Sequence, residues 1–99
     1  MKMESQQPIR SGYAIFRQYL FQGATPACYD ETDYPVVFAT ELEAQREIAD
    51  NQLTRIQEFI DGERDFDDAI STDEFVLSVD VWPDGRISIE DGRIFGKVE

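Results

Sequence analysis

The chain has 99 residues, of which 41% are hydrophobic and 12% aromatic, and its formal net charge is −12. This length suits one modest hydrophobic core and excludes two, and the aromatic content excludes a disordered chain. There is no histidine and only one cysteine, which excludes Ser/His/Asp and Cys/His triads, histidine zinc sites and an internal disulfide.

Hydropathy sets a further limit. No apolar stretch approaches the roughly 20 residues of a membrane span, and Met1 to Arg10 has no apolar signal region. We therefore expect a cytoplasmic protein, in the host cytoplasm if a phage encodes it, with no membrane contact. Because the chain has no histidine and no diagnostic catalytic motif, we also expect no enzymatic activity, no cofactor and no metal.

The N-terminal third predicts an arm and two strands. Residues 1–12 are polar and are expected to form a flexible N-terminal arm, followed by a single domain over residues 13–99. Tyr13 to Gln22 is apolar on both of its alternating faces, which predicts a central strand. Residues 23–35 have the composition of a loop, and Val36 to Phe38 predicts a short second strand.

A helix is predicted from Glu41 to Asp61. Thr40 and Glu43 form a capping box, in which each residue satisfies a backbone N–H group at the start of the helix. Apolar residues then recur near a 3.6-residue period, and Gly62 offers a left-handed stop. The recurring apolar residues are Leu42, Ile48, Ala49, Leu53, Ile56, Phe59 and Ile60, of which Leu42, Leu53, Ile56 and Ile60 lie opposite the acids of the helix.

The C-terminal third predicts a three-stranded meander. Its strands are expected at residues 75–82, 86–90 and 93–98, with tight turns at Pro83 to Gly85 and at Asp91 and Gly92. The whole order predicts an α+β fold, with an antiparallel sheet of four to five strands and one long amphipathic helix packed on one face.

The negative charge is concentrated in the second part of the chain, where residues 30–99 hold 20 acids and six bases. At about 100° per residue, the acids of the helix form a row on the side opposite its apolar residues. The acidic connection after the helix, residues 62–74, continues this row. The candidate partner-binding residues are Glu43, Glu47, Asp50, Glu58, Asp61, Asp65, Asp67 and Asp68.

This acidic row suggests mimicry of a nucleic-acid backbone. Carboxylates three or four helix positions apart stand about 5 to 6 Å from each other, which is comparable with the spacing of phosphates along a strand. The row therefore predicts a non-enzymatic DNA-mimic inhibitor that blocks the basic, nucleic-acid-binding surface of a protein partner. Direct binding of nucleic acid is not expected, because the domain as a whole repels phosphate.

Two alternatives stay open. In the first, the acidity serves solubility, and the chain is a housekeeping or structural protein-interaction domain. In the second, the acidic connection binds a divalent cation. If Glu63 is the first position of an EF-hand-type loop, then Asp65, Asp67 and Glu74 fall on ligand positions, but the glycine required at the sixth position is Asp68.

The segments Phe38 to Ile48, which contains the pattern Phe-x-Thr-Glu-x-Glu-Ala, and Ile56 to Phe66 resemble known sequences. They are similar to small acidic uncharacterised proteins of proteobacteria, their phages and mobile elements. The similarity covers about a third of the chain. Proteins of this kind include anti-CRISPR inhibitors that obstruct the DNA-binding surface of a CRISPR effector complex. The resemblance implies such a complex, or another DNA-binding protein, as the partner, and it implies no catalytic residue.

Overall fold

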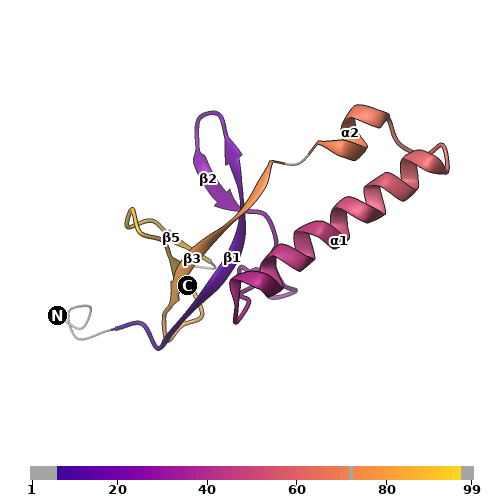
Figure 1. The fold of residues 1–99 in the computed structure, drawn as a ribbon. Helices are drawn as coiled ribbons and strands as arrows, with labels where there is room; N and C mark the ends of the chain where they lie inside the picture. The colour runs from indigo at the N-terminus through magenta and orange to yellow at the C-terminus, as the bar shows by residue number, and fades with distance from the viewer. Residues whose placement is uncertain (1–6, 72, 97–99) are drawn as a thin grey trace.

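The computed structural model describes residues 7–71 and 73–96, and its architecture is α+β. Five antiparallel strands form one sheet in the order β2-β1-β3-β4-β5. Helices α1 (Glu41–Ile60) and α2 (Phe66–Ile70) lie between β2 and β3 in the chain (Figure 1). The strands are β1 (Arg10–Tyr19), β2 (Gly23–Pro26), β3 (Glu74–Val81), β4 (Ile87–Ser88) and β5 (Ile94–Phe95). The predicted class and the antiparallel sheet with a helix are thus confirmed.

Several boundaries differ from the prediction. Strand β1 begins at Arg10, so Arg10 to Gly12 belong to the sheet and not to an N-terminal arm. The predicted loop contains β2, because Gly23, with a φ of 72°, turns the chain back to pair with β1.

The short strand predicted at Val36 to Phe38 does not form. Phe38 makes only an isolated bridge to Tyr13. Residues 1–6 of the predicted arm, and the last two residues of the strand predicted over 93–98, lie outside the described residues.

The core lies on one face of the two long strands. Their register pairs Phe16 with Phe75 and Ala14 with Leu77, so these side chains share one face. The ring of Phe95 meets Phe16 edge-on at 5.6 Å between centroids, which brings β5 over the same face. Complete burial of a side chain such as Phe16 stabilises the fold by about 1.5 to 3 kcal/mol. The buried cluster consists of Ala14, Phe16, Val79, Val81 and Ile87.

The turns that bracket β4 are copies of each other. In each, an aspartate accepts hydrogen bonds from the backbone N–H and the Nε–H of the arginine two residues later: Asp84 from Arg86, and Asp91 from Arg93. The glycine between them has a φ near 95° in both, 93° and 96°, a conformation that glycine adopts without strain. The four-residue sequence Asp-Gly-Arg-Ile occurs at both turns and encodes the same local structure twice.

Helix α1 diverges from the sheet. It has 20 residues, and Ala44, near its start, is its one buried residue. Figure 1 shows the helix running away from the strands toward α2, and the Cα trace extends 56 × 28 × 23 Å along its principal axes. The prediction of a long helix packed along one face of the sheet is therefore not confirmed. In the described residues, neither helix is long and apolar enough to cross a membrane.

Candidate functional site

The start of α1 is fixed by the predicted capping box. The Thr40 hydroxyl accepts a hydrogen bond from the Glu43 N–H at 3.1 Å, and Glu43 Oε1 accepts one from the Ala39 N–H at 3.1 Å. The first bond satisfies a donor that the helix itself leaves unpaired, and the second holds the N–H of the residue before the N-cap. Since the Glu43 carboxylate is held at the cap, it is less available to a partner than the sequence suggested.

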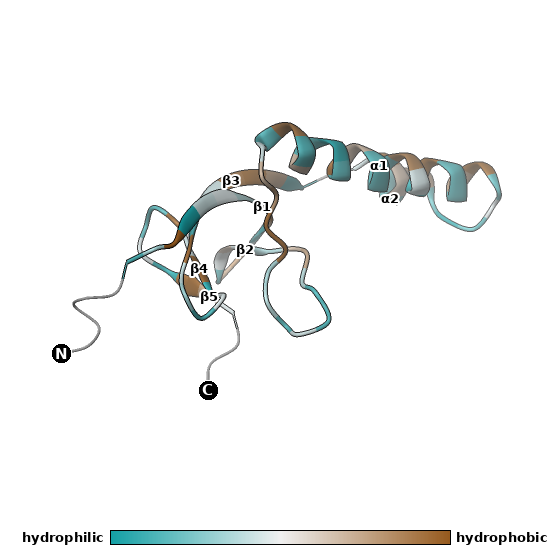
Figure 2. Ribbon diagram, turned by 90° about the horizontal axis from the view of Figure 1, so that it is seen from below, coloured by the Kyte–Doolittle hydropathy of each residue, from teal (hydrophilic) through white to brown (hydrophobic). Residues whose placement is uncertain are grey.

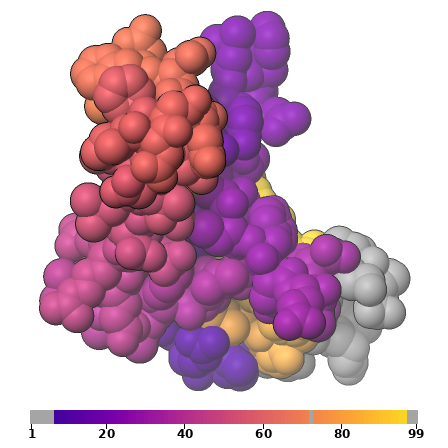
Figure 3. Space-filling view, turned by 90° about the vertical axis from the view of Figure 1, so that its right-hand side faces the viewer, coloured from indigo at the N-terminus to yellow at the C-terminus, as the bar shows by residue number. Residues whose placement is uncertain are grey.

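The second half of α1 packs on α2 through polar groups. Gln52 Nε2 donates to the Ala69 carbonyl and Arg55 Nη2 donates to the Ser71 carbonyl, so two unpaired carbonyls at the end of α2 find partners on α1. The ring of Phe59 meets that of Phe66 edge-on at 5.2 Å. Together, α1 and α2 form an antiparallel pair, which we call the helical arm; Figure 3 shows it along one flank of the molecule.

These contacts turn α1 so that much of its predicted apolar side faces solvent. Ala44, Ile48, Gln52 and Arg55 face the sheet or α2 and are buried or half-buried. The residues expected in the core are exposed: Leu42 by 55%, Leu53 by 65% and Ile60 by 65%. Only Ile56 among them is half-buried. The hydropathy colouring of Figure 2 shows apolar segments along α1 where it extends past the strands.

The structure divides the eight predicted acids by their surroundings. Glu58 and Asp68 both form ion pairs with Arg64, whose Nε lies 2.6 Å from Glu58 Oε1. Their hydrogen bonds, with that of Glu58 the larger cause, raise the pKa of the Arg64 guanidinium above its ordinary value. Asp61 accepts a hydrogen bond from Gln57 at 3.0 Å. With Glu43 in the cap, half of the predicted acids are engaged inside the chain.

The other four acids are exposed and form no ion pair with any described residue. Glu47 and Asp50 lie near the middle of α1, one turn apart. Asp65 precedes α2 without making a side-chain cap bond, and Asp67 lies in its first turn. The continuous row expected from the sequence is therefore two separate pairs, one on α1 and one at the start of α2.

The acidic connection does not have the geometry of a cation loop. Residues 66–70 form α2, where an EF-hand-type loop would wrap its ligands around an ion. Over residues 7–71 and 73–96, no three Asp, Glu or Cys side chains are grouped so that they could hold a metal ion. The alternative of a divalent-cation protein has no ligand set in this part of the chain.

Cys28 is half-buried. Its burial, followed by the negative charges of Glu74 and Glu47, raises the pKa of the thiol above its ordinary value. Since the thiolate is the nucleophile, these surroundings disfavour covalent catalysis by Cys28. The geometry fits a small packing residue.

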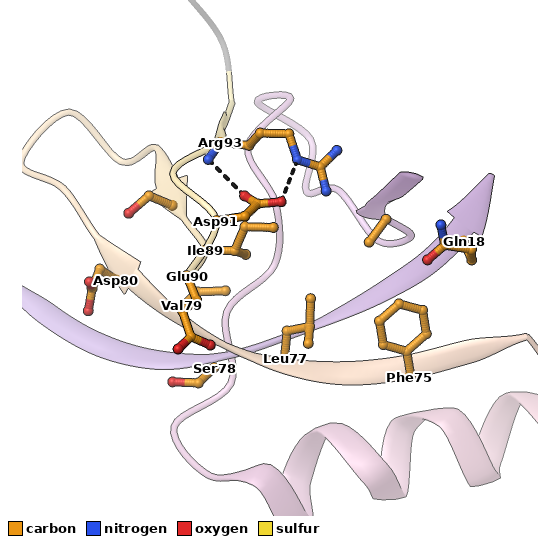
Figure 4. Close-up of a pocket in the computed structure, with 12 residues that line it drawn as sticks. Gln18, Phe75, Leu77, Ser78, Val79, Asp80, Ile89, Glu90, Asp91 and Arg93 are labelled. Atoms are coloured by element: carbon orange, nitrogen blue, oxygen red, sulfur yellow. Dashed lines mark hydrogen bonds and ion pairs between the residues drawn. The ribbon is translucent and has the colours of Figure 1, made fainter. Parts of the chain in front are cut away.

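A hollow of about 650 Å³ opens on the face of the sheet away from α1. Phe75, Leu77 and Val79 form its apolar floor, and Figure 4 shows Phe75 and Leu77 pointing away from the α1 ribbon. At the rim, the hydrogen bonds that Asp91 accepts from Arg93, first from its backbone N–H, lower the pKa of Asp91. The hollow offers space for an apolar group and shows no nucleophile with an adjacent base.

A second, smaller hollow of about 370 Å³ brings together three of the chain's seven arginines, Arg17, Arg55 and Arg64. Each is already bound. Arg17 pairs with Asp73 and Glu74, Arg64 with Glu58 and Asp68, and Arg55 donates to Gln52 and to the Ser71 carbonyl. Four carboxylates thus surround three guanidinium groups, which leaves no surplus positive charge to attract an anion.

Sequence reasoning missed the exposed apolar side of α1, and also the tip of the β1–β2 hairpin. Leu20 and Phe21 at this tip are 88% and 94% exposed, although Phe21 was expected in a strand. One signal for this was available in the sequence. Gln52 and Arg55 interrupt the apolar pattern in the second half of α1, and their side chains are the ones that contact α2.

Comparison of the chain with protein-family models, with curated proteins and with solved structures finds no match. The candidate site therefore rests on the geometry of the helical arm.

Proposed function

We propose that this protein is a non-enzymatic binding protein that occupies the basic, nucleic-acid-binding surface of a protein partner, and that it does so through α1. One observation carries the proposal: Glu47 and Asp50 stand exposed, with no ion pair to any described residue, on a helix that projects from the sheet. A basic groove that binds DNA by neutralising phosphates attracts such carboxylates for the same reason.

Because half of the predicted acids are engaged within the chain, only the other four are proposed to contact the partner directly. Glu47 and Asp50 supply the central contacts, and Asp65 and Asp67 extend them at the far end of the helical arm. Glu43, Glu58, Asp61 and Asp68 contribute mainly to the electrostatic field, because their oxygens already accept hydrogen bonds within the chain. A CRISPR effector complex, as for an anti-CRISPR inhibitor, or another DNA-binding protein has the basic surface that this proposal requires.

A second candidate is a protein-interaction domain that binds through apolar surface and whose acidity serves solubility. The exposure of Leu53 and Ile60 favours it, since large exposed apolar patches mark interaction sites. The two candidates differ in their response to salt, because screening weakens contacts between charges and leaves apolar contacts in place.

The test is a pull-down from the lysate of the source cell at low and at high salt, with captured proteins identified by mass spectrometry. The double variant Glu47→Lys/Asp50→Lys should lose the partner. Double-stranded DNA added to the captured complex should release it, because both ligands compete for one surface.

The matched control is Glu31→Lys/Glu90→Lys, which changes the net charge equally at two exposed positions away from α1. It should retain the partner. If the partner is captured equally well at low and high salt, and equally well by Glu47→Lys/Asp50→Lys, the proposal is contradicted and the second candidate is favoured.

A further inference from the structure

The exposed side of α1 carries a regular apolar seam. Its positions follow one another at intervals of four and three residues, which is the heptad spacing of helices that pack side by side. They are Leu42, Arg46, Ala49, Leu53, Ile56 and Ile60. Four of the six are large apolar side chains, and Leu42, Leu53 and Ile60 are each more than half exposed.

The described part of the chain leaves this seam largely uncovered, and only Ile56 is half-buried. The sheet and α2 contact other positions of α1, which are Ala44, Gln52, Arg55 and Phe59. The helix is about 30 Å long at 1.5 Å per residue, so the seam offers a partner helix nearly three heptads of contact.

The charges beside the seam identify the chemistry of its occupant. Glu43 and Asp50 lie about one quarter-turn from the seam on one flank, and Gln45 and Gln52 lie on the other. Glu43 is held at the cap and Gln52 is bound to α2, so Asp50 and Gln45 are the flanking side chains open to a partner. A complementary helix therefore places lysine or arginine against Asp50 and a neutral polar residue against Gln45.

A second copy of this chain does not meet that requirement. In an antiparallel pair, the flank of Glu43 and Asp50 faces the same acids of the other copy; in a parallel pair, it faces Gln45 and Gln52. Neither orientation places a cation opposite this flank. Each also brings together two molecules of net charge −12.

We propose that the seam of α1 docks an amphipathic helix of the partner, with apolar residues on Leu53, Ile56 and Ile60 and basic residues against Asp50. The sign of the partner's charge rests on the proposed function. The apolar contact goes beyond it, because a DNA mimic alone requires no apolar anchor. Leu53 is the central anchor, since it lies mid-seam and exposes 65% of its surface.

The test uses a synthetic helical peptide of about three heptads, with leucine at the seam positions and lysine along one flank. Binding to the full chain is followed by calorimetry at low salt. We expect Leu53→Gln/Ile60→Gln to weaken the peptide's affinity at least tenfold. The control Leu20→Gln, at an equally exposed apolar position on the β1–β2 hairpin, should change it less than twofold. Circular dichroism verifies that all variants are folded.

Two further peptides separate the contribution of the apolar stripe from that of the basic charge. A scrambled peptide of the same composition keeps the charge and loses the apolar stripe, and a peptide with glutamate for lysine keeps the stripe and reverses the charge. Both should bind at least tenfold more weakly than the original. Equal binding of the original and scrambled peptides, or no binding of the original peptide, overturns the docking seam.

The outcomes also distinguish the two proposals. If the natural partner is lost with Glu47→Lys/Asp50→Lys and retained with Leu53→Gln/Ile60→Gln, the docking seam is wrong and the proposed function stands. If analytical ultracentrifugation shows a dimer of the wild-type chain that Leu53→Gln dissociates, a second copy covers the seam and the inference is overturned.

Discussion

Gly12 lets the segment that leads into α1 lie close beside β1 and pair with it. A Cβ atom at this position would lie 2.5 Å from Val37 Cγ1 and 2.9 Å from the Phe38 carbonyl oxygen. The close approach allows Tyr13 and Phe38 to exchange backbone hydrogen bonds of 2.9 and 2.7 Å. The chain thereby enters α1 directly from the surface of β1.

Replacing Gly12 by alanine should therefore destabilise the protein by about 1 to 3 kcal/mol, because the backbone of Phe38 has to move away. Urea denaturation followed by circular dichroism measures the change. Ser11→Ala, at the exposed neighbouring position, should remain within about 0.5 kcal/mol of wild type. Equal stability of Gly12→Ala and wild type would show that this close approach tolerates a Cβ atom.

Asp30 holds the loop before α1 through three hydrogen bonds. Its Oδ1 accepts from the Thr32 hydroxyl at 2.7 Å, the Thr32 N–H at 2.8 Å and the Tyr34 N–H at 3.1 Å. These bonds, that of the Thr32 hydroxyl first, lower the pKa of Asp30 below its ordinary value. The carboxylate thus stabilises the folded chain only while it is ionised.

The sign of the pH dependence follows from this shift. Because the pKa of Asp30 is lower in the folded than in the unfolded chain, its contribution is complete above the unfolded value of about 3.9 and is lost as the pH falls through the folded value. The gap in unfolding free energy between wild type and Asp30→Asn should therefore narrow as the pH falls from about 5 to about 2. Glu31→Gln, in the same loop, controls for the loss of one negative charge. A gap that stays constant with pH would contradict this role of Asp30.

At the scale of the element, α1 depends on its N-terminal cap. Thr40→Ala removes the hydroxyl that accepts from the Glu43 N–H, which should cost about 1 kcal/mol of stability. Thr54 offers a matched control within the same helix, since its hydroxyl donates to the Asp50 carbonyl at an exposed interior position. Thr54→Ala should be neutral or slightly stabilising, because alanine is the better helix former.

Urea denaturation of both threonine variants, monitored by the helical circular dichroism signal, provides the comparison. Equal losses in the two variants would mean that the cap contributes no more than any other threonine hydroxyl of the helix.

The elements could be predicted where local sequence determines them. The capping box gave the start of α1 because its two bonds join residues within one turn, and alternating apolar residues gave β3 within one residue. Strand β2 was missed because Gly23 to Pro26 has no apolar alternation and is extended only through its pairing with β1. The repeated Asp-Gly-Arg-Ile was visible in the sequence, yet only the structure shows that it builds two equivalent turns.

The candidate site was harder to predict, because periodicity defines the faces of a helix without telling which face is covered. The decisive contacts join Gln52 to Ala69 and Arg55 to Ser71, and they exist only because α2 folds back on α1. The same fold-back brings Arg64 to both Glu58 and Asp68. The acids could be predicted by position, but not which of them remain unpaired.

At the scale of the whole molecule, the net charge of −12 opposes compaction. Raising the salt concentration from about 10 mM to about 100 mM shortens the Debye length from roughly 30 to roughly 10 Å, so like charges on the sheet and helices repel one another less. The melting temperature should therefore rise, and a gain of about 1 kcal/mol corresponds to roughly 4 to 8 °C for a domain of this size.

Thermal unfolding at the two salt concentrations measures this effect. The variant Glu47→Gln/Asp50→Asn should show a smaller rise, because it removes two of the exposed negative charges. A melting temperature that falls with salt would mean that the ion pairs of Arg17 and Arg64 outweigh the general repulsion.

Because α1 diverges from the sheet, the helical arm and the sheet should differ in how easily they unfold locally. Since Ala44 is the one buried residue of α1 and Ala69 that of α2, the helical arm gains little of its stability from the sheet. Its amides should exchange with deuterium through local opening, at lower free energy than those of β1 and β3. We therefore expect the arm to open as a separate cooperative unit, which a bound partner would protect from exchange while the sheet amides change little.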